Sequence, residues 1–292
     1  MRSKRMSLRE AASLIPSGSS ITLSGAILPR QPMAFVHELV RRGVRDLTVK
    51  LFVGSVGVDL LIGAGGVRRV ETAYVGLGPF GLAPNFRRSA EAGRLEVEDM
   101  SESALMARFR ASGYGVPYLP TKALLGTSMA EHTPNAAAAV CPFTGEQVHE
   151  VRAAHSDFTI VHGHWADEYG NVQHPVRRNT DECDQMLAKA ASRLIVTVEK
   201  IVPPRVVRDN STLTWIPHHW VEAVVEVPYG AHPGSCDGLY SEDEAHLRLY
   251  ALHGKTEEGF RAYLDTYVTG VKDHWEYLER IGGIRRLCQL RM

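Results

Sequence analysis

What this sequence lacks excludes several classes of protein. Its 292 residues include only four cysteines, and no two of them form a CxxC pair: Cys141, Cys183, Cys236 and Cys288. We therefore expect neither a disulfide scaffold nor a zinc knuckle, and a reducing cytoplasm fits best. The basic N-terminal stretch has no continuous apolar core, so we expect no signal peptide. No apolar run is long enough to span a bilayer, and no membrane partner is expected.

An excess of charge of one sign is also missing. Lys plus Arg is 33 and Asp plus Glu is 33, which gives a formal net charge of zero. A balanced chain has no broad positive field, so general nucleic-acid binding is not expected. Two small basic clusters, Arg41, Arg42 and Arg45, and Arg87 and Arg88, leave a local pocket for a phosphorylated ligand open. A solvated surface is the ordinary alternative for each cluster.

The familiar motifs of several enzyme classes are absent. The chain has no GxxxxGK[ST] phosphate loop, no GxSxG elbow and no HExxH helix motif. The turn Gly63-Ala-Gly-Gly66 lacks the GxGxxG order, which favours a tight turn over an anion-binding or dinucleotide loop. His162, His164 and His174 could together reach an ion, but no carboxylate motif accompanies them. We therefore expect no metal.

What is present is a regular alternation of apolar segments. Apolar runs predict strands at residues 21–23, 47–53, 70–75, 158–161, 194–198 and 221–227. Helical spacing and caps predict helices at 8–15, 32–42, 58–62, 85–92, 101–112 and 186–192. Strands that alternate with helices indicate an α/β fold with a mostly parallel sheet, buried on both faces. Residues 131–146 are interpreted as a long loop, and the chain from about residue 241 as mostly helical.

Seven stretches resemble one family, and they occur in the same order along the chain. They are Gly25 through Arg30-Gln-Pro-Met-Ala-Phe-Val36, Gly43-Val-Arg-Asp-Leu-Thr48, Asp59-Leu-Leu-Ile-Gly-Ala-Gly65 followed by Val67-Arg-Arg-Val70, Phe80 to Arg88, Gly115-Val-Pro-Tyr-Leu-Pro-Thr121 with Leu125-Gly-Thr127, Ala166-Asp-Glu-Tyr-Gly-Asn171, and Val225 to Pro233. Together they resemble the α-type subunits of the glutaconate CoA-transferase group, within the family I CoA-transferases. The resemblance implies an open α/β sandwich, with residues 1–292 as a single domain.

The resemblance also implies a reaction and a partner. Family I enzymes transfer CoA between an acyl-CoA and a carboxylate, here a dicarboxylic or 3-oxo acid, through a glutamate nucleophile. CoA is then substrate or product, and no tightly bound cofactor is implied. The nucleophile usually lies in an S-E-N-G-like turn of a β-type subunit, and this chain contains no such tetrapeptide. We therefore expect a β-type partner in an α2β2 heterotetramer.

Two groups of residues are candidates for binding the acyl-CoA. Ser24, Gly25 and Ala26 follow the first predicted strand, where open α/β sheets place ligands, and their small side chains permit close approach. Arg30 could hold a carboxylate with two hydrogen bonds, with a salt bridge as the alternative. The second group offers a cation, amides and hydroxyls: Lys122, Gly126, Thr127 and Ser128.

Two other functions stay open. Some relatives have moved toward hydrolytic C–C ring cleavage or decarboxylation of an acidic CoA ester, which needs a general base. Glu98 and Glu102 are the candidate bases, although Glu102 begins a predicted helix and an ordinary capping acid is the alternative. A non-catalytic scaffold that only completes the partner's site is the third possibility. The partner's residue at the nucleophile position would distinguish transfer from hydrolysis or decarboxylation.

Overall fold

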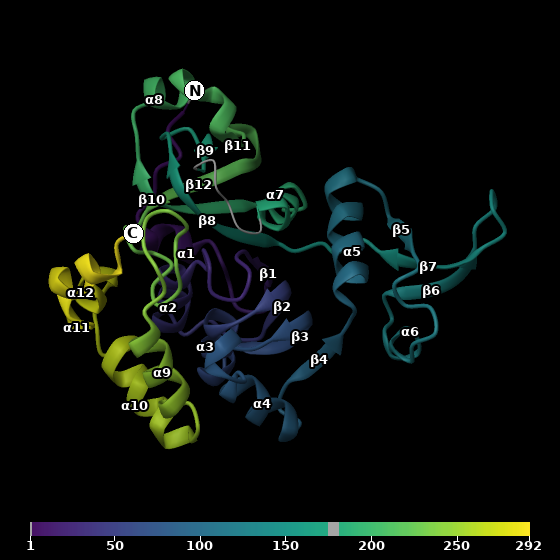
Figure 1. The fold of residues 1–292 in the computed structure, drawn as a ribbon, viewed down its shortest axis with the longest axis horizontal. Helices are drawn as coiled ribbons and strands as arrows, with labels where there is room; N and C mark the ends of the chain where they lie inside the picture. Colours follow the sequence, from purple (N-terminus) through teal and green to yellow (C-terminus); the bar gives the residue numbers. More distant parts are fainter. Residues whose placement is uncertain (1, 175–180) are drawn as a thin grey trace.

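A long, mostly parallel sheet lies at the centre of the computed structural model, which describes residues 2–174 and 181–292 (Figure 1). Within these residues seven strands run parallel in the order β4-β3-β2-β1-β8-β10-β12. Their bounds are β1 Ser20–Leu23, β2 Leu47–Gly54, β3 Val67–Val75, β4 Glu96–Asp99, β8 Phe158–Ala166, β10 Leu194–Ile201 and β12 Val221–Glu226. Two short antiparallel strands, β9 Val172–Gln173 and β11 Thr214–Ile216, extend the sheet beyond β8. The predicted α/β class with a mostly parallel sheet is confirmed.

The sheet is covered on both faces, as its continuous apolar strands predict. Successive side chains of a strand point to opposite faces. Ile160 and Val161 are neighbours in β8, both are fully buried, and they belong to two different apolar clusters. One cluster therefore fills each side of the sheet.

Helices from both halves of the chain build the larger of these two cores. They are α1 Leu8–Ser13, α2 Met33–Arg41, α3 Val56–Gly63, α4 Pro84–Glu91, α9 Glu244–His253 and α10 Glu257–Tyr267. Phe35 of α2, Leu60 of α3 and Tyr250 of α9 are all buried in the same cluster. The rings of Tyr250 and Tyr263 pack edge to face with their centroids 5.0 Å apart. The last two helices, α11 His274–Arg280 and α12 Gly283–Leu290, follow α10 and confirm the helical C-terminal part.

The order of the strands creates one switch point. The chain moves outward from β1 through β2 and β3 to β4, and then returns to place β8 on the other side of β1. Ile21 of β1 pairs with Val49 of β2 and with Phe158 of β8. Loops therefore leave β1 and β8 in opposite directions above the carboxyl ends of these strands. In open α/β sheets this crevice is where ligands bind.

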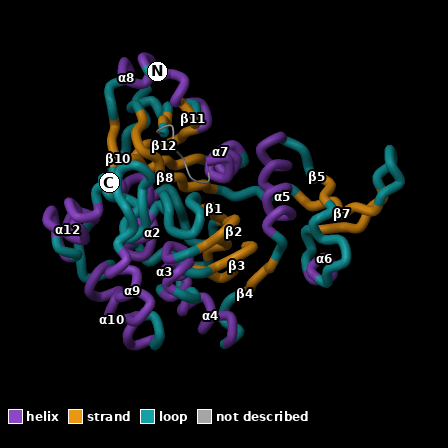
Figure 2. Tube along the Cα trace, viewed as in Figure 1, coloured by secondary structure: helices purple, strands orange, loops and turns teal. Residues whose placement is uncertain are grey.

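A small antiparallel sheet projects from the body beside α5 Glu102–Tyr114 (Figures 1 and 2). It has the order β5-β7-β6, with β5 Tyr118–Thr121, β6 Ala136–Val140 and β7 Gln147–Arg152, and a short helix α6 Met129–His132 precedes β6. We call residues 118–152 the projecting sheet. The predicted loop at 131–146 is wrong in its middle, because Ala136 to Val140 pair with β7. Alanine has little strand propensity, so this pairing leaves no sequence signal.

Most other boundaries differ from the predictions by a few residues. The helix predicted at 186–192 is α7 Asp181–Lys189, which begins five residues earlier, and α8 Pro204–Asp209 was not predicted. The strand predicted at 158–161 continues to Ala166. None of the described helices combines the length and apolar character that crossing a membrane requires.

Candidate active site at the switch point

The loop after β1 is held in a conformation that its sequence alone would resist. Gly25 has φ +88°, and a Cβ there would lie 2.6 Å from the carbonyl oxygen of Pro29. Ile27 and Arg30 also have positive φ, 60° and 52°. For a β-branched residue such as Ile27 this is a strained backbone, which persists only where the surroundings enforce it. Such strain is concentrated at functional sites, and this loop lies at the switch point.

Asp184 of α7 fixes both ends of this loop. Its Oδ1 accepts the backbone N–H of Gly25 at 2.8 Å, and its Oδ2 accepts Nε and Nη2 of Arg30 at 3.3 and 3.1 Å. Neither side chain is exposed to solvent, at 1% for Asp184 and 0% for Arg30. One buried carboxylate therefore determines where the first and last residues of the turn lie.

Arg30 is oriented into the protein and away from solvent. In addition to Asp184, its Nη1 pairs with Asp237, and its backbone N–H donates to the carbonyl of Ser235 at 2.8 Å. The guanidinium thus joins the loop to the segment that follows β12. This geometry favours the salt-bridge alternative over a direct hold on a substrate carboxylate, and the direct contact stays a prediction.

Three consecutive amides of the loop have no hydrogen-bond acceptor among the described residues. They belong to Ala26, Ile27 and Leu28, whereas the amides on either side, of Gly25 and Arg30, are both bonded. Ala26 and Ile27 are partly exposed. Amide donors that are fixed in place and have no acceptor are the groups that stabilise a developing oxyanion. The loop is therefore equipped to bind an acyl oxygen.

Glu199, just beyond the strand predicted at 194–198, is a partly buried acid at the centre of the hydrogen bonds beside this loop. Its Oε1 accepts from His162 Nε2 at 2.8 Å, from the Tyr240 hydroxyl at 2.6 Å and from the Gly230 amide at 3.2 Å, and its Oε2 accepts the Tyr229 amide at 2.6 Å. Burial raises the pKa of Glu199, but these donors outweigh burial and hold that pKa below its ordinary value. Glu199 is therefore charged, with both oxygens in use.

The three histidines that the sequence suggested as metal ligands each contact a different group. His164 donates Nε2–H to the Asp237 carbonyl at 2.6 Å, and burial lowers the pKa of His164 to about 4, so it is neutral. His174 packs on the His164 ring with centroids 4.8 Å apart. Among the described residues, the group with metal-ligand spacing is instead His162, Glu199 and Cys236, with ligand atoms within 4.8 Å of one another.

The protonation and hydrogen bonds of these three residues fit a hydrogen-bond network better than a metal site. Burial raises the pKa of the Cys236 thiol well above its ordinary value, and a metal requires the thiolate. Glu199 already accepts four hydrogen bonds, and the second nitrogen of His162, Nδ1, contacts Thr197 Oγ1 at 2.9 Å. The hydrogen bonds to Glu199 instead join β8 to the segment that follows β12, beside the switch point.

The second group of predicted binding residues lies on the projecting sheet. Lys122 pairs with Glu146 at 2.6 Å, and both side chains are more than half exposed. Thr127 Oγ1 donates to the Leu124 carbonyl at 2.9 Å, and Gly126 and Ser128 are exposed. Figure 1 shows this sheet apart from β1 and β8. Within one chain the structure does not bring these residues to the loop at Gly25.

Glu98 lies on β4, three strands from β1, or roughly 14 Å by the usual strand spacing. Its Oε1 accepts from Asn135 at 2.7 Å and from Thr133, and its Oε2 pairs with Arg69. Burial raises the pKa of Glu98, but these bonds and the charges of Arg108 and Arg69 outweigh burial and lower that pKa. A carboxylate held in its charged form by this many partners is poorly suited to accept a proton.

Glu102 is the first residue of α5 and is exposed. Ser101 caps this helix through its Oγ, which accepts the Ala104 amide at 3.3 Å. This position agrees with the capping-acid alternative, and a role for Glu102 as a base stays a proposal.

Sequence reasoning found the loop but missed the acids that hold it. Glu199 and Asp237 are hydrogen-bonded beside the switch point, and Glu199 could have been found as a polar residue at the end of an apolar strand. Asp184 lies within a helix and has no such signal. Its role depends on where α7 packs, which only the tertiary structure determines.

Comparison with known proteins shows what the chain as a whole is similar to. The family model described as "Coenzyme A transferase" matches residues 5–227. The chain is 34% identical to one subunit of the glutaconate CoA-transferase of Acidaminococcus fermentans, over 97% of this chain and 93% of that one. It is 30% identical to the cholesterol ring-cleaving hydrolase IpdA subunit of Mycobacterium tuberculosis, over 94% and 97%. It is also 40% identical to an uncharacterized protein of Archaeoglobus fulgidus, and spans 65% of that protein's length.

Solved structures give the same result. The crystal structure of glutaconate coenzyme A-transferase from Acidaminococcus fermentans matches with a TM-score of 0.93 and 32% identity, covering 99% of this chain and 96% of that one. A variant of the decarboxylase AibA/AibB matches with a TM-score of 0.78 and 31% identity, covering 90% and 99%. Since the family model and the near-full-length relatives agree, the chain belongs to the coenzyme A transferase family.

Proposed function

We propose that this chain is the α-type subunit of an acyl-CoA:carboxylate CoA-transferase that acts on a dicarboxylic or 3-oxo acyl-CoA. In this proposal a β-type partner supplies the nucleophilic glutamate, CoA is substrate or product with no tightly bound cofactor, and the enzyme works in the cytoplasm. The observation that carries the proposal is the loop at residues 24–30 at the switch point. Three of its amides have no acceptor among the residues that the structure describes, and Asp184 bonds both of its ends.

The carboxylates of this chain at the site support a nucleophile from elsewhere. Glu199 has both oxygens in hydrogen bonds, and Asp184 and Asp237 are paired with Arg30. Each is therefore committed to holding the loops. A carboxylate that must attack a thioester carbonyl needs a free oxygen lone pair directed at the acyl carbon.

The reaction then divides into steps that this loop can assist. The partner's glutamate would attack the thioester carbonyl and CoA thiolate would leave, which gives an acyl anhydride. The thiolate would then attack the glutamyl carbonyl of this anhydride, which forms a glutamyl-CoA thioester and releases the acyl group as its carboxylate. Negative charge develops on the acyl oxygen when the glutamate adds, and on the carbonyl oxygen of the glutamate when the thiolate adds. The amides of Ala26 and Ile27 are suited to stabilise it, and typical losses on removing one such donor are about 10²–10³ in kcat.

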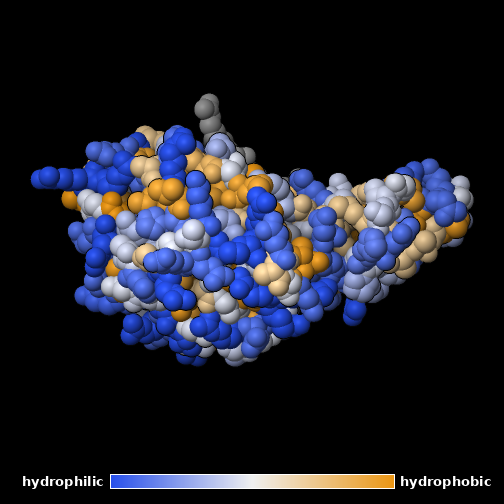
Figure 3. Space-filling model, turned by 90° about the horizontal axis from the view of Figure 1, so that it is seen from below, coloured by the Kyte–Doolittle hydropathy of each residue, from blue (hydrophilic) through white to orange (hydrophobic). Residues whose placement is uncertain are grey.

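The surface of the chain is compatible with a permanent partner. Large apolar side chains are exposed on α5 and the projecting sheet: Tyr114, Tyr118, Leu125, Val140 and Phe143. Phe143, in the turn between β6 and β7, is 92% exposed. Figure 3 shows apolar and pale patches along this projection, on the right of that view. Obligate interfaces are large and apolar, so this surface supports an α2β2 assembly.

A second function stays a candidate, because relatives of similar identity are named as a decarboxylase and as part of a ring-cleaving hydrolase. Either reaction of an acidic CoA ester would use the same loop amides to stabilise an enolate or an oxyanion. Of the two predicted bases, Glu102 is the more accessible, since Glu98 is buried and paired.

The test compares the isolated chain with the chain purified together with its β-type partner. We expect acceptor-dependent transfer from a dicarboxylic acyl-CoA only in the complex. Transfer by the isolated chain would overturn the assignment of the nucleophile to the partner. Release of free CoA or carbon dioxide by the complex without any acceptor would favour the second function. A complex whose activity is unchanged by substitutions in the loop at residues 24–30 would favour a scaffold.

A further inference from the structure

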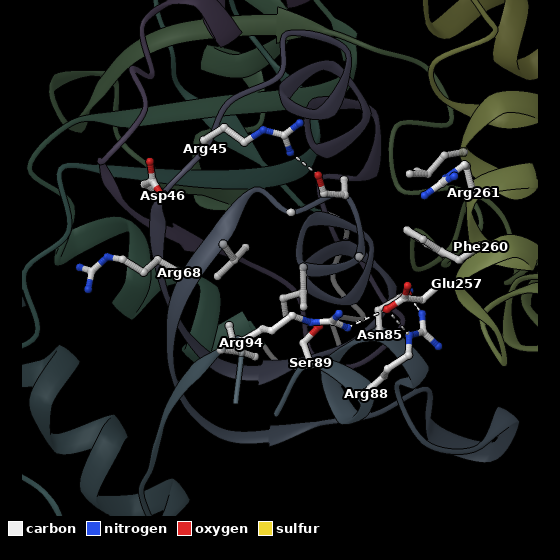
Figure 4. A pocket seen from close by; sticks show the side chains of 17 residues that line it. Arg45, Asp46, Arg68, Asn85, Arg88, Ser89, Arg94, Glu257, Phe260 and Arg261 are labelled. Carbon is white, nitrogen blue, oxygen red and sulfur yellow. Dashed lines mark hydrogen bonds and ion pairs between the residues drawn. The ribbon is translucent and has the colours of Figure 1, made fainter. Parts of the chain in front are cut away.

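A cavity lies at the amino-terminal ends of strands β2, β3 and β4, whereas the switch point lies at the carboxyl ends of the strands. Its volume is about 700 Å³, and it is formed by residues just before β2 and β4, the start of β3, the turn after α3, and helices α4 and α10. Because the loop at Gly25 follows the carboxyl end of β1, the length of β2 separates the two sites by roughly 25 Å. Figure 4 shows this cavity from close by.

The cavity concentrates positive charge in a chain that has no net charge. Five arginines and two acids line it: Arg45, Arg68, Arg88, Arg94, Arg261, Asp46 and Glu257. Five guanidinium groups against two carboxylates leave three positive charges in the lining, and Glu96 outside the lining offsets part of one of them by pairing with Arg68 at 3.6 Å. Two of these arginines, Arg45 and Arg88, belong to the clusters noted in the sequence, and the fold brings them together with the turn Gly63-Ala-Gly.

The arginines of the cavity differ in how many protein groups they already bond. Arg45 donates to the Ala64 carbonyl and Arg88 donates to the Gly254 carbonyl at 2.7 Å, so both are tied to the wall. Arg94 forms an ion pair with Glu257, with 2.8 Å between Nη2 and Oε1. Arg261 makes no hydrogen bond or ion pair with the described residues, although its charge acts on Glu257. Arg94 and Arg261 are therefore the groups that a ligand could engage.

Backbone amides contribute little to this site. The amides of Ala64, Gly65 and Gly66 donate to carbonyls of α3 at 2.9 Å, which confirms the tight-turn interpretation of this segment. The apolar part of the lining comes from side chains such as Ile62, Leu95 and Phe260. Small-molecule sites are concave, range from about 300 to 1,000 Å³, and combine apolar walls with a few directed polar groups.

We propose that this cavity binds a small organic diphosphate, either a free nucleotide or the nucleotide half of CoA, at a site separate from the switch point. Guanidinium groups match phosphate oxygens with paired hydrogen bonds. Two to three net positive charges complement the two to three negative charges of a diphosphate better than the single charge of a carboxylate. The concave shape favours a small molecule over a protein surface.

The direct test is calorimetric titration of the full-length chain at low salt with ADP, CoA, pyrophosphate and acetate. We expect the three diphosphates to bind and acetate not to bind. Binding of ADP and CoA alike identifies the shared diphosphate as sufficient, and binding of ADP alone identifies a free nucleotide. No binding by any diphosphate overturns the proposal.

Variants assign the binding to this cavity. Arg94→Ala and Arg261→Ala should each weaken ADP affinity about tenfold or more, because each removes a charge-assisted hydrogen bond. Glu257→Gln should strengthen it about threefold or more, since this acid competes with the ligand for Arg94. A gain of affinity cannot come from partial unfolding.

The matched control is Arg87→Ala. Arg87 lies on the same helix as Arg88 but pairs with Glu91 at 2.7 Å and does not line the cavity. The ADP affinity of this variant should equal that of the parent chain. An equal loss in Arg87→Ala and Arg261→Ala, or a loss in Glu257→Gln, would place the binding elsewhere and overturn the proposal.

Discussion

Arg30 and Asp184 form an ion pair of 3.1 Å in which neither side chain is exposed to solvent. The pair closes the loop after β1, because the same carboxylate also accepts the Gly25 amide. A buried pair gives little net stability when intact, but removing one partner leaves the other charge buried without compensation. The main role of the pair is therefore to position the loop, and its contribution to stability is secondary.

The first prediction follows from this pair. Asp184→Asn keeps an acceptor for Gly25 but removes the charge that faces Arg30, which retains Asp237. We expect a loss of stability near the lower end of about 3–5 kcal/mol, and a fall in kcat of the complex that exceeds any change in KM. Urea unfolding and steady-state kinetics measure the two effects. Asp209→Asn, which changes an exposed acid paired with Arg205 on α8, is the control and should alter neither.

The second prediction separates backbone strain from steric conflict. Gly18 and Gly25 have nearly equal φ, +85° and +88°, but a Cβ at Gly18 meets no atom within 4 Å, whereas a Cβ at Gly25 meets the Pro29 carbonyl at 2.6 Å. Gly18→Ala should cost about 1–2 kcal/mol of stability and leave activity unchanged. Gly25→Ala should cost more and also abolish most activity, because the loop must move.

Kinetics and thermal unfolding of both glycine variants check this prediction. Equal activity in the two variants would show that the exact path of the loop does not matter for turnover, and would count against its amides as oxyanion donors.

How far the sequence predicts this molecule depends on the range of the contacts. The strand at β2 and the helix at α2 are determined by local apolar patterns, and both predictions are correct within a residue or two. The order of the family stretches led to the loop at Gly25. The β6 strand was missed because an alanine run becomes a strand only through its pairing with β7.

In the site, too, local features could be predicted from the sequence and long-range contacts could not. Small residues after a strand could be read from the sequence, but the partner of Arg30 could not, since Asp184 is 154 positions away along the chain. The sequence suggested a substrate carboxylate for Arg30, and the fold supplies two carboxylates of its own. His162 and His164 are spaced as metal ligands in the sequence, but in the fold they bond Glu199 and the Asp237 carbonyl.

The third prediction concerns stability in acid. Burial lowers the pKa of His164 to about 4, that of His246 to about 3 and that of His274 to about 4. In the unfolded chain each pKa is about 6.5. Between these values the unfolded chain binds protons that the folded chain excludes, so stability is complete above pH 6.5 and is lost as pH falls toward 4. Each histidine contributes a slope of up to about 1.4 kcal/mol per pH unit.

Urea unfolding between pH 7.5 and 5 measures this slope. His246→Gln should make the dependence shallower by about one proton, since it removes one buried group that must stay neutral. His219→Gln changes an exposed histidine and should leave the slope as in the parent chain. A parent chain whose stability did not change over this range would contradict the burial of neutral histidines.

The last prediction concerns the covalent intermediate. If the partner's glutamate is the nucleophile, exposure of the complex to a dicarboxylic acyl-CoA without acceptor should leave CoA bound as a thioester on a β-type subunit. Hydroxylamine or borohydride should then inactivate the complex, because both attack such a thioester. Mass spectrometry of the two kinds of chain locates the adduct.

The Gly25→Ala variant makes this experiment specific to the present chain. Its altered loop should slow formation of the adduct on the partner, because the proposal assigns the oxyanion donors to this chain and the glutamate to the partner. Gly18→Ala should form the adduct at the parent rate. An adduct on this chain would return the nucleophile to one of its own carboxylates. Turnover without any adduct, with free CoA accumulating, would instead favour hydrolysis or decarboxylation, and a Glu102→Gln variant that lost this turnover while still assembling would identify the base.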